Sequence, residues 1–205
     1  GCSLLDAALA EPVACVIGGV EMLELTHLDE VVLVGAGFMG LLAVRYLALL
    51  GHRVTVVEPV ARRRELAVEL GAARAVEPDA ARGMYPDGAS LVVEATGAAG
   101  GLALASDLCA IGATLGILGY HQSGGGERTV PMESWNFRAL KVLSLHHRDP
   151  ANVLRWIDRA QRSAARGGIV PSALVDAQLP LDDAPLGLRA VPASEAPVKA
   201  VLVLS

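Results

Sequence analysis

A glycine-rich segment of the chain has the spacing of a loop that binds the phosphates of a dinucleotide. The apolar run Val31 to Val34 leads into Gly35-Ala36-Gly37-Phe38-Met39-Gly40, and a second apolar segment of helical length follows. Between a strand and a helix, such glycines permit a tight turn, close approach of a pyrophosphate, and close packing of the helix. The amino end of the helix then faces the phosphates. The residues predicted to bind pyrophosphate are Gly35, Gly37, Phe38, Met39 and Gly40.

A carboxylate follows at the distance that this kind of loop requires. Glu58 ends the next β-branched run and lies 18 residues after Gly40, where an acidic side chain accepts hydrogen bonds from the adenosine ribose. Such a carboxylate about 4 Å from a 2′-phosphate would repel it by about 4 kcal/mol at an effective dielectric near 20. We therefore predict NAD as the cofactor, with NADP less favoured.

Three consecutive arginines, Arg62 to Arg64, follow Glu58 and leave two alternatives open. A guanidinium here could bind a phosphate, and Arg63 is included among the predicted cofactor-binding residues for this reason. Alternatively, all three side chains lie on the solvated first turn of a helix.

Short apolar runs alternate with segments of helical period along most of the chain. This alternation predicts an α/β protein with a doubly wound, parallel, six-stranded Rossmann sheet in the order 3-2-1-4-5-6. The predicted strands are residues 31–34, 54–57, 73–76, 91–94, 114–118 and 140–145, and the predicted helices between them are residues 38–50, 62–70, 98–108 and 151–165.

The two ends of the chain differ from this pattern. Leu4 to Leu25 predicts two leading helices, interrupted at Glu11-Pro12. After Gly168 the chain contains five prolines and a terminal run, residues 198–204, that predicts a strand. We therefore expect a nucleotide-binding domain with its leading helices over residues 1–170 and a short C-terminal extension over residues 171–205.

Composition narrows the classes of function. Hydrophobic residues make up 53% of the 205 residues and charged residues 19%, which excludes intrinsic disorder. A net charge of -5 and an aromatic content of 3% argue against nucleic acid as a partner.

The longest apolar run is shorter than a membrane span, and no signal peptide is recognisable at the amino end, so we expect no membrane association and a cytoplasmic location. The three cysteines and five histidines, including His27 and His121, lack metal-ligand spacing.

Several motifs together resemble the medium-chain dehydrogenase/reductase family, in particular its polyol and threonine dehydrogenase-like branch. The segments that carry the resemblance are Glu11-Pro12-Val13-Ala14-Cys15, Arg63-Arg64-Glu65-Leu66-Ala67, Glu94-Ala95-Thr96-Gly97, Ile111-Gly112-Ala113-Thr114-Leu115, Pro180-Leu181-Asp182-Asp183-Ala184 and Val198-Lys199-Ala200-Val201. The fourth segment differs in one respect, because this branch usually has Pro-Gly-Gly where the chain has Ile111-Gly112-Ala113.

The resemblance implies an oxidoreductase that transfers hydride between a secondary alcohol or ketone and NAD. It places Ala95, Thr96 and Gly97 beside the nicotinamide, and Glu11 beside a catalytic metal, although Glu11 could equally be a charge at a helix start. In this family a barrel half with a catalytic Cys and a His-Glu pair precedes the segment seen here. We therefore expect this chain to supply the cofactor-binding half, to hold no zinc, and to turn over no alcohol alone. The substrate and the catalytic residues are not predicted.

Other classes of protein fit part of the pattern. A non-catalytic nucleotide-binding module or fragment would share the glycine turn and Glu58. A flavin-binding domain would also share them, but it usually carries a Gly-Asp pair, and no Gly-Asp dipeptide occurs here. A methyltransferase is less consistent, because Glu94-Ala95-Thr96-Gly97 stands where an acidic-proline motif would be expected.

The sixth predicted strand suggests an assembly. Residues 140–145 are largely apolar, with Lys141 as their one charge, and the sixth strand of such a sheet lies at an edge. Exposed edges pair with other chains unless they are covered. We expect a homodimer joined through this edge with Val142 to Leu145 at its centre, an arrangement that the family resemblance also implies; the alternative is that the proline-rich tail covers the edge in a monomer.

Overall fold

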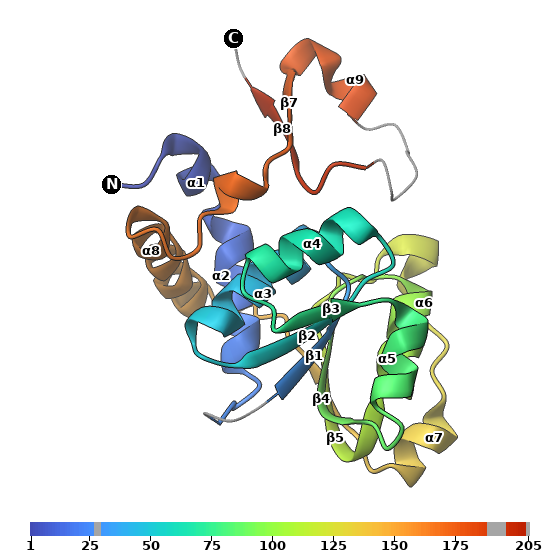
Figure 1. Ribbon diagram of the computed structural model, residues 1–205. Coiled ribbons are helices and arrows are strands. Elements are labelled where there is room, and N and C mark those ends of the chain that lie inside the picture. The colour runs from blue at the N-terminus through green and yellow to red at the C-terminus, as the bar shows by residue number, and fades with distance from the viewer. Residues whose placement is uncertain (27–29, 188–195, 204–205) are drawn as a thin grey trace.

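The computed structural model describes residues 1–26, 30–187 and 196–203 of the chain. Within these residues, six parallel strands form one sheet in the order β3-β2-β1-β4-β5-β6 (Figure 1). The predicted fold class and strand order are therefore confirmed. The strands are β1 (Glu30–Val34), β2 (Arg53–Val57), β3 (Arg74–Val76), β4 (Ala89–Glu94), β5 (Cys109–Ile117) and β6 (Lys141–Ser144).

Helices cover both faces of the sheet, and each face has its own core. On one side lie α2 (Ala10–Glu21), α3 (Phe38–Leu49), α4 (Ala61–Glu69) and α8 (Pro150–Ala165); on the other lie α5 (Pro78–Met84) and α6 (Ala99–Asp107) (Figure 1). Strand β1 contributes side chains to both cores. Val31 and Leu33 belong to the first core, and Val32 and Val34 belong to the second. A parallel strand buried on both faces reads as a continuous apolar run, which is the pattern in the sequence.

Three local features differ from the sequence-based expectation. The leading helices α1 (Leu4–Ala8) and α2 separate at Leu9, while Pro12 lies in the first turn of α2, where no amide donor is needed. Helices α5 and α7 (Met132–Phe137) were not predicted, because α5 buries only Ala81 and α7 buries nothing, so neither has an apolar period. Strand β5 starts at Cys109, earlier than predicted. Cys109 pairs with Ala89, and an irregularity separates this pair from the regular pairing that begins at Leu91.

The C-terminal part forms a separate parallel pair, β7 (Ala177–Pro180) with β8 (Ala200–Val203), beyond the main sheet (Figure 1). Strand β8 lies within the predicted run 198–204, whose last residue is outside the described residues. Asp176 connects this part to α4, because its carboxylate accepts hydrogen bonds from Arg62 at 2.9 Å and from the Val198 amide at 3.1 Å. The shorter elements are η1 (Ser123–Gly126), η2 (Pro171–Leu174), η3 (Leu181–Asp183) and α9 (Ala184–Gly187).

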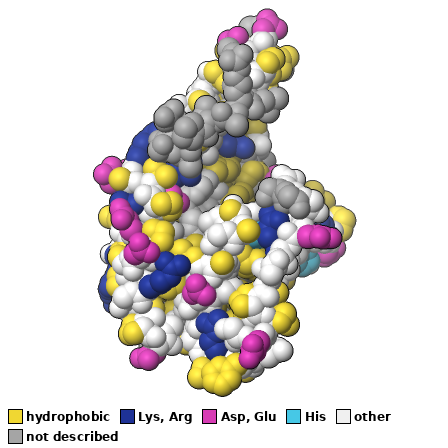
Figure 2. Space-filling view, turned by 90° about the vertical axis from the view of Figure 1, so that its right-hand side faces the viewer, with side chains coloured by type: hydrophobic (Ala, Val, Ile, Leu, Met, Phe, Trp, Pro, Cys, Tyr) yellow, Lys and Arg dark blue, Asp and Glu magenta, His cyan; other side chains and the backbone are white. Residues whose placement is uncertain are grey.

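Figure 2 shows basic and acidic side chains interspersed over one face of the molecule rather than gathered by sign. Of the helices described here, none has both the length and the apolar character that crossing a membrane requires.

Asp6 joins the amino-terminal helix to the η2 turn. It is 6% exposed and accepts hydrogen bonds from the Ser3 hydroxyl at 2.5 Å and the Ser172 amide at 3.0 Å. Burial raises the pKa of Asp6, but the hydrogen bonds from Ser172 and Ser3 outweigh it, so the pKa lies below the ordinary value. The carboxylate therefore stabilises the fold above about pH 4, and this contribution is lost as the pH falls through the lower folded-state pKa.

We predict that Asp6→Asn lowers the free energy of unfolding by about 1–2 kcal/mol at neutral pH, with a smaller loss near pH 3. Urea unfolding of the variant and the parent chain at both pH values measures the difference. Asp79→Asn is the matched control, because the Asp79 side chain is 99% exposed. An equal loss for Asp6→Asn at both pH values would contradict the assignment.

Candidate functional site

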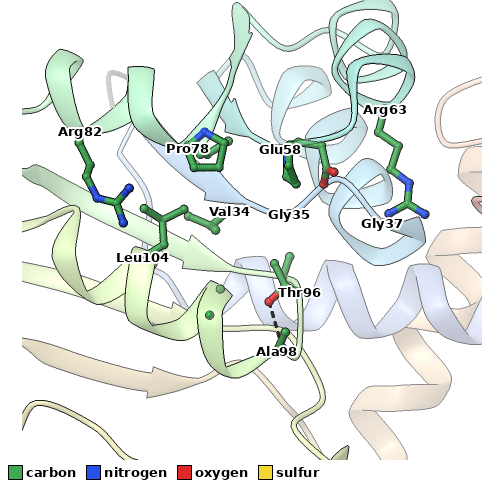
Figure 3. Close-up of a pocket in the computed structure, with 15 residues that line it drawn as sticks. Val34, Gly35, Gly37, Glu58, Arg63, Pro78, Arg82, Thr96, Ala98 and Leu104 are labelled. Carbon is green, nitrogen blue, oxygen red and sulfur yellow. Dashed lines mark hydrogen bonds between the residues drawn. The ribbon is translucent and has the colours of Figure 1, made fainter. Parts of the chain in front are cut away.

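A cavity of about 490 Å³ lies at the carboxyl ends of β1, β2 and β4 (Figure 3). The order of the sheet reverses at β1, and ligands of doubly wound sheets bind in the crevice at such a reversal. The residues that line the cavity are Val34, Gly35, Gly37, Val57, Glu58, Pro59, Arg63, Pro78, Arg82, Ala95, Thr96, Ala98, Gly100, Gly101 and Leu104.

The three glycines of the turn have different structural roles. Gly35 has a φ of +102°, and a Cβ there would lie 2.5 Å from the Thr96 side chain. A Cβ on Gly40 would lie 2.1 Å from the Gly35 carbonyl oxygen. A Cβ on Gly37, in contrast, would meet nothing within 4 Å, and Gly37 lines the cavity. Gly35 and Gly40 therefore shape the turn, whereas Gly37 leaves space for a ligand.

The amino end of α3 meets this open space. Gly37 is the N-cap residue, and no side chain caps the helix, so its first amide groups have no acceptor of that kind. Arg63 extends from α4 at the Gly37 side of the cavity (Figure 3). Unpaired helix amides, a cation and room beside Gly37 together fit a phosphate group, because the helix dipole and the guanidinium both attract negative charge.

Glu58 holds the glycine turn in place and also faces the cavity. Its carboxylate accepts hydrogen bonds from the Ala36 amide at 2.7 Å and the Val60 amide at 3.0 Å, and the residue is 4% exposed. A carboxylate has about four lone-pair positions, so these two bonds leave acceptor capacity for hydroxyl groups of a ligand. The bonds of Glu58 to the two backbone amides were not predicted from the sequence. Its contact with the adenosine ribose stays a prediction.

The three arginines, which the sequence did not distinguish, have different surroundings in the structure. Arg62 forms an ion pair with Asp176 at 2.9 Å, and its side chain is 63% exposed. Arg64 forms an ion pair with Glu77 at 2.9 Å and donates to the Glu58 carbonyl oxygen at 2.9 Å. Within the described part of the chain, Arg63 is therefore the member of the triplet that lines the cavity.

Six of the ten predicted cofactor-binding residues line the cavity: Gly35, Gly37, Glu58, Arg63, Ala95 and Thr96. Phe38 and Met39 instead pack against the core, and the Phe38 ring lies 5.0 Å from the Lys199 ammonium. Gly40 packs on Gly35, and Gly97 packs against the Tyr120 backbone.

One end of the cavity was not predicted from the sequence. Pro78 from the start of α5, Leu104 from α6 and Arg82 form this end (Figure 3). Arg82 also forms an ion pair with Asp79 at 3.1 Å. Pro78 and Leu104 are ordinary apolar residues far along the chain from the glycine turn, so no local signal distinguishes them from core residues.

The part of the chain that the structure describes contains no group of three His, Cys, Asp or Glu side chains that could hold a metal ion; His27 lies outside it. Glu11 lies exposed in the first turn of α2 and accepts a hydrogen bond from the Cys15 thiol at 3.1 Å. Burial, together with Glu11, raises the pKa of Cys15 to about 12, which disfavours the thiolate that zinc requires. These residues do not fit a zinc site by themselves, and the placement of Glu11 beside a metal stays a prediction.

Comparison with solved structures identifies the same architecture in larger proteins. A protein from Sinorhizobium meliloti described as a zinc-binding dehydrogenase, bound to NADP, is 28% identical with a TM-score of 0.81 over 98% of this chain and 61% of its own. An alcohol dehydrogenase from Thermus sp. ATN1 is 27% identical with a TM-score of 0.79 over 100% of this chain and 61% of its own. The L-idonate 5-dehydrogenase of Escherichia coli, 22% identical with a TM-score of 0.81 over 98% of this chain and 57% of its own, shares the fold.

This chain thus spans about three fifths of the length of these structures. A family model described as zinc-binding dehydrogenase matches residues 39–160, which is more than half of the chain and includes most of the glycine turn's helix, Glu58 and the loop after β4. The chain belongs to the zinc-binding dehydrogenase family.

Proposed function

We propose that this chain is the NAD(H)-binding part of an oxidoreductase that acts on a secondary alcohol or the corresponding ketone. The observation that carries the proposal is the open space at Gly37, bounded by the uncapped amino end of α3, Arg63 and the Glu58 carboxylate. Family membership supports the reaction class. In this proposal the alcohol is bound by another part of a longer protein. The β7–β8 pair, after residue 170, belongs to the segment that leads back to that part.

Each part of the cavity has a task in this proposal. The α3 amides and Arg63 bind the pyrophosphate, and Glu58 accepts hydrogen bonds from the adenosine ribose. Pro78 and Leu104 provide apolar surface for the adenine ring. Thr96 and its neighbours support the nicotinamide half, and the bound nicotinamide supplies the hydride chemistry.

A titration of the chain with NADH and with ADP-ribose, followed by calorimetry, tests the proposal. Both compounds carry the adenosine and pyrophosphate that the described cavity is proposed to bind, so both are expected to bind. Failure of both to bind would contradict the proposal. Turnover of secondary alcohols is a separate measurement, expected to require the remaining part of the enzyme.

We further propose that NAD is preferred over NADP. Glu58 is buried and fixed by two amide hydrogen bonds, so it cannot turn away from a 2′-phosphate. Arg62 and Arg64 are held in ion pairs with Asp176 and Glu77 and do not line the cavity. The NADP bound to the Sinorhizobium meliloti protein shows that this fold also accepts the phosphorylated cofactor, so the preference depends on the side chains here.

We predict that NADH binds at least about tenfold more tightly than NADPH, and that Glu58→Gln narrows this ratio because it removes the negative charge. The ratio of the two dissociation constants, measured on the same preparation, is the readout, since Glu58→Gln also weakens the amide contacts and lowers both affinities. Arg62→Gln is the control, because Arg62 lies outside the cavity wall. Equal binding of NADH and NADPH by the parent chain would show that Arg63 outweighs Glu58.

We also propose that the chain forms a homodimer through the edge of β6. Strand β6 pairs with β5 on one side, and no described strand pairs with its other side. Val142 is 38% exposed there, which leaves it available to a second copy. Leu145, expected at the centre of the interface from the sequence, is 2% exposed within the chain's own core, so the centre of the proposed interface moves to Val142.

A further inference from the structure

The loop after β4 is held by a carboxylate that no solvent reaches. Glu94 ends β4 with a side chain that is 0% exposed. Its Oε1 accepts hydrogen bonds from the Thr96 amide at 2.6 Å, the Gly97 amide at 3.0 Å and the Thr96 hydroxyl. Burial of a charged group is costly unless the charge is paired, so the partners of the second oxygen matter.

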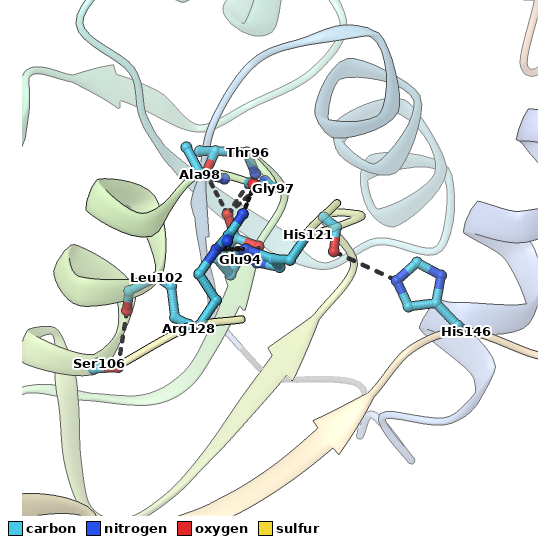
Figure 4. A network of polar contacts seen from close by, with 10 residues as sticks. Glu94, Thr96, Gly97, Ala98, Leu102, Ser106, His121, Arg128 and His146 are labelled. Carbon is cyan, nitrogen blue, oxygen red and sulfur yellow. Dashed lines mark hydrogen bonds and ion pairs between the residues drawn. The ribbon is translucent and has the colours of Figure 1, made fainter. Parts of the chain in front are cut away.

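Those partners come from the segment after β5 (Figure 4). Glu94 Oε2 lies 2.9 Å from His121 Nε2, and the Arg128 Nε–H donates to His121 Nδ1 at 3.0 Å. The Arg128 Nη2 group then donates to the Gly97 carbonyl oxygen at 3.3 Å. These contacts close a ring that starts at the Gly97 amide and returns to the Gly97 carbonyl, so that loop residue is fixed at both of its polar backbone groups.

These contacts also determine which imidazole nitrogen of His121 carries the proton. Arginine can only donate, so His121 Nδ1 must accept, and the imidazole proton must be on Nε2, which donates to Glu94. A neutral imidazole thus links the Glu94 anion to the Arg128 cation. His121 is 11% exposed, which suits a linking role better than a role in solvent.

The held loop forms one wall of the cofactor cavity. Thr96 lines the cavity, and its hydroxyl accepts a hydrogen bond from the amide of Ala98, which also lines it. Gly97 has a φ of +67°, and a Cβ there would lie 2.8 Å from the Tyr120 carbonyl oxygen. The post-β4 loop therefore has little room to move relative to the post-β5 segment.

In a doubly wound sheet the two halves of a dinucleotide lie over the two halves of the sheet. Glu58 places adenosine over the β1–β2–β3 half, which leaves the nicotinamide over the loops after β4 and β5. We propose, building on the proposed NAD(H) function, that Glu94, His121 and Arg128 form a positioning relay that fixes the Thr96–Gly97 wall for the nicotinamide half of the cofactor. The three residues act through the loop and need not touch the cofactor.

The test compares NADH with ADP-ribose, which lacks the nicotinamide. The parent chain is expected to bind NADH more tightly. In His121→Phe and in Arg128→Met, the dissociation constant of NADH is expected to rise about tenfold, while that of ADP-ribose changes by less than about twofold. The emission change of the reduced nicotinamide on binding is expected to fall in parallel. His121→Gln, whose amide can donate to Glu94 and accept from Arg128, is expected to restore NADH binding.

Arg155→Met is the matched control, because Arg155 is an exposed residue of α8 that donates to Asn152 and to no residue of the ring of contacts. ADP-ribose binding reports whether each variant is folded, and Arg128→Met provides the comparison if His121→Phe does not fold. Unchanged NADH affinity in the variants, or an equal loss for NADH and ADP-ribose, would overturn the relay. Equal binding of the two compounds by the parent chain would overturn it as well, whereas no binding of either would instead refute the proposed function.

Discussion

Replacement of Gly37 by valine is expected to abolish NADH binding and to leave the fold intact. Gly37 has φ -73° and ψ -175°, an extended conformation that valine adopts readily. A Cβ there meets no protein atom within 4 Å, so the new side chain occupies the space proposed for the pyrophosphate. We expect the dissociation constant of NADH to rise by about a hundredfold or more. Calorimetry measures the affinity, and thermal unfolding reports the stability.

Two other glycines provide controls for this prediction. Gly83→Val places the same side chain on a glycine that also has open space around it but does not line the cavity, and it is expected to keep NADH affinity. Gly40→Ala is expected to destabilise the fold itself, because its Cβ would lie 2.1 Å from the Gly35 carbonyl oxygen. Parent-like NADH affinity in Gly37→Val would remove the basis for placing the pyrophosphate at this turn.

The second large effect concerns assembly. Light scattering is expected to give the mass of a dimer for the parent chain at tens of micromolar, and the mass of a monomer for Val142→Lys. Lysine on an edge strand opposes pairing with another chain, because a second copy would have to bury its charge. Val142 is the better site for this change than Leu143, which packs partly against the core, so its replacement would also weaken the fold.

Leu154→Lys is the control for assembly. Leu154 is also an exposed apolar residue, at 68%, but it lies on α8 and not at the sheet edge. It is expected to leave the mass unchanged. A monomeric mass for the parent chain, or a dimer that persists in Val142→Lys, would rule out pairing centred on this part of β6.

The six-stranded sheet and the position of its glycine turn could be predicted from the sequence alone. Strand β1 is buried on both faces and therefore appears as an uninterrupted apolar run directly before Gly35. The turn needs glycine at Gly35 because its φ is +102°, and at Gly40 because a Cβ there would meet the Gly35 carbonyl oxygen. Both requirements are local, and Glu58 follows at the end of the next strand. Such short-range requirements leave a readable pattern, because each is met by residue type at fixed spacing.

Which of several equivalent residues face the cavity depends on tertiary packing. Arg62, Arg63 and Arg64 are identical in type, and only their different partners, Asp176 and Glu77 for two of them, leave Arg63 at the wall. The sequence indicated only that His121 lacks metal-ligand spacing, yet the fold brings it to Glu94 from 27 positions away. The physical reason is that a hydrogen bond between distant segments depends on how strands and loops pack together, and no local spacing records that packing.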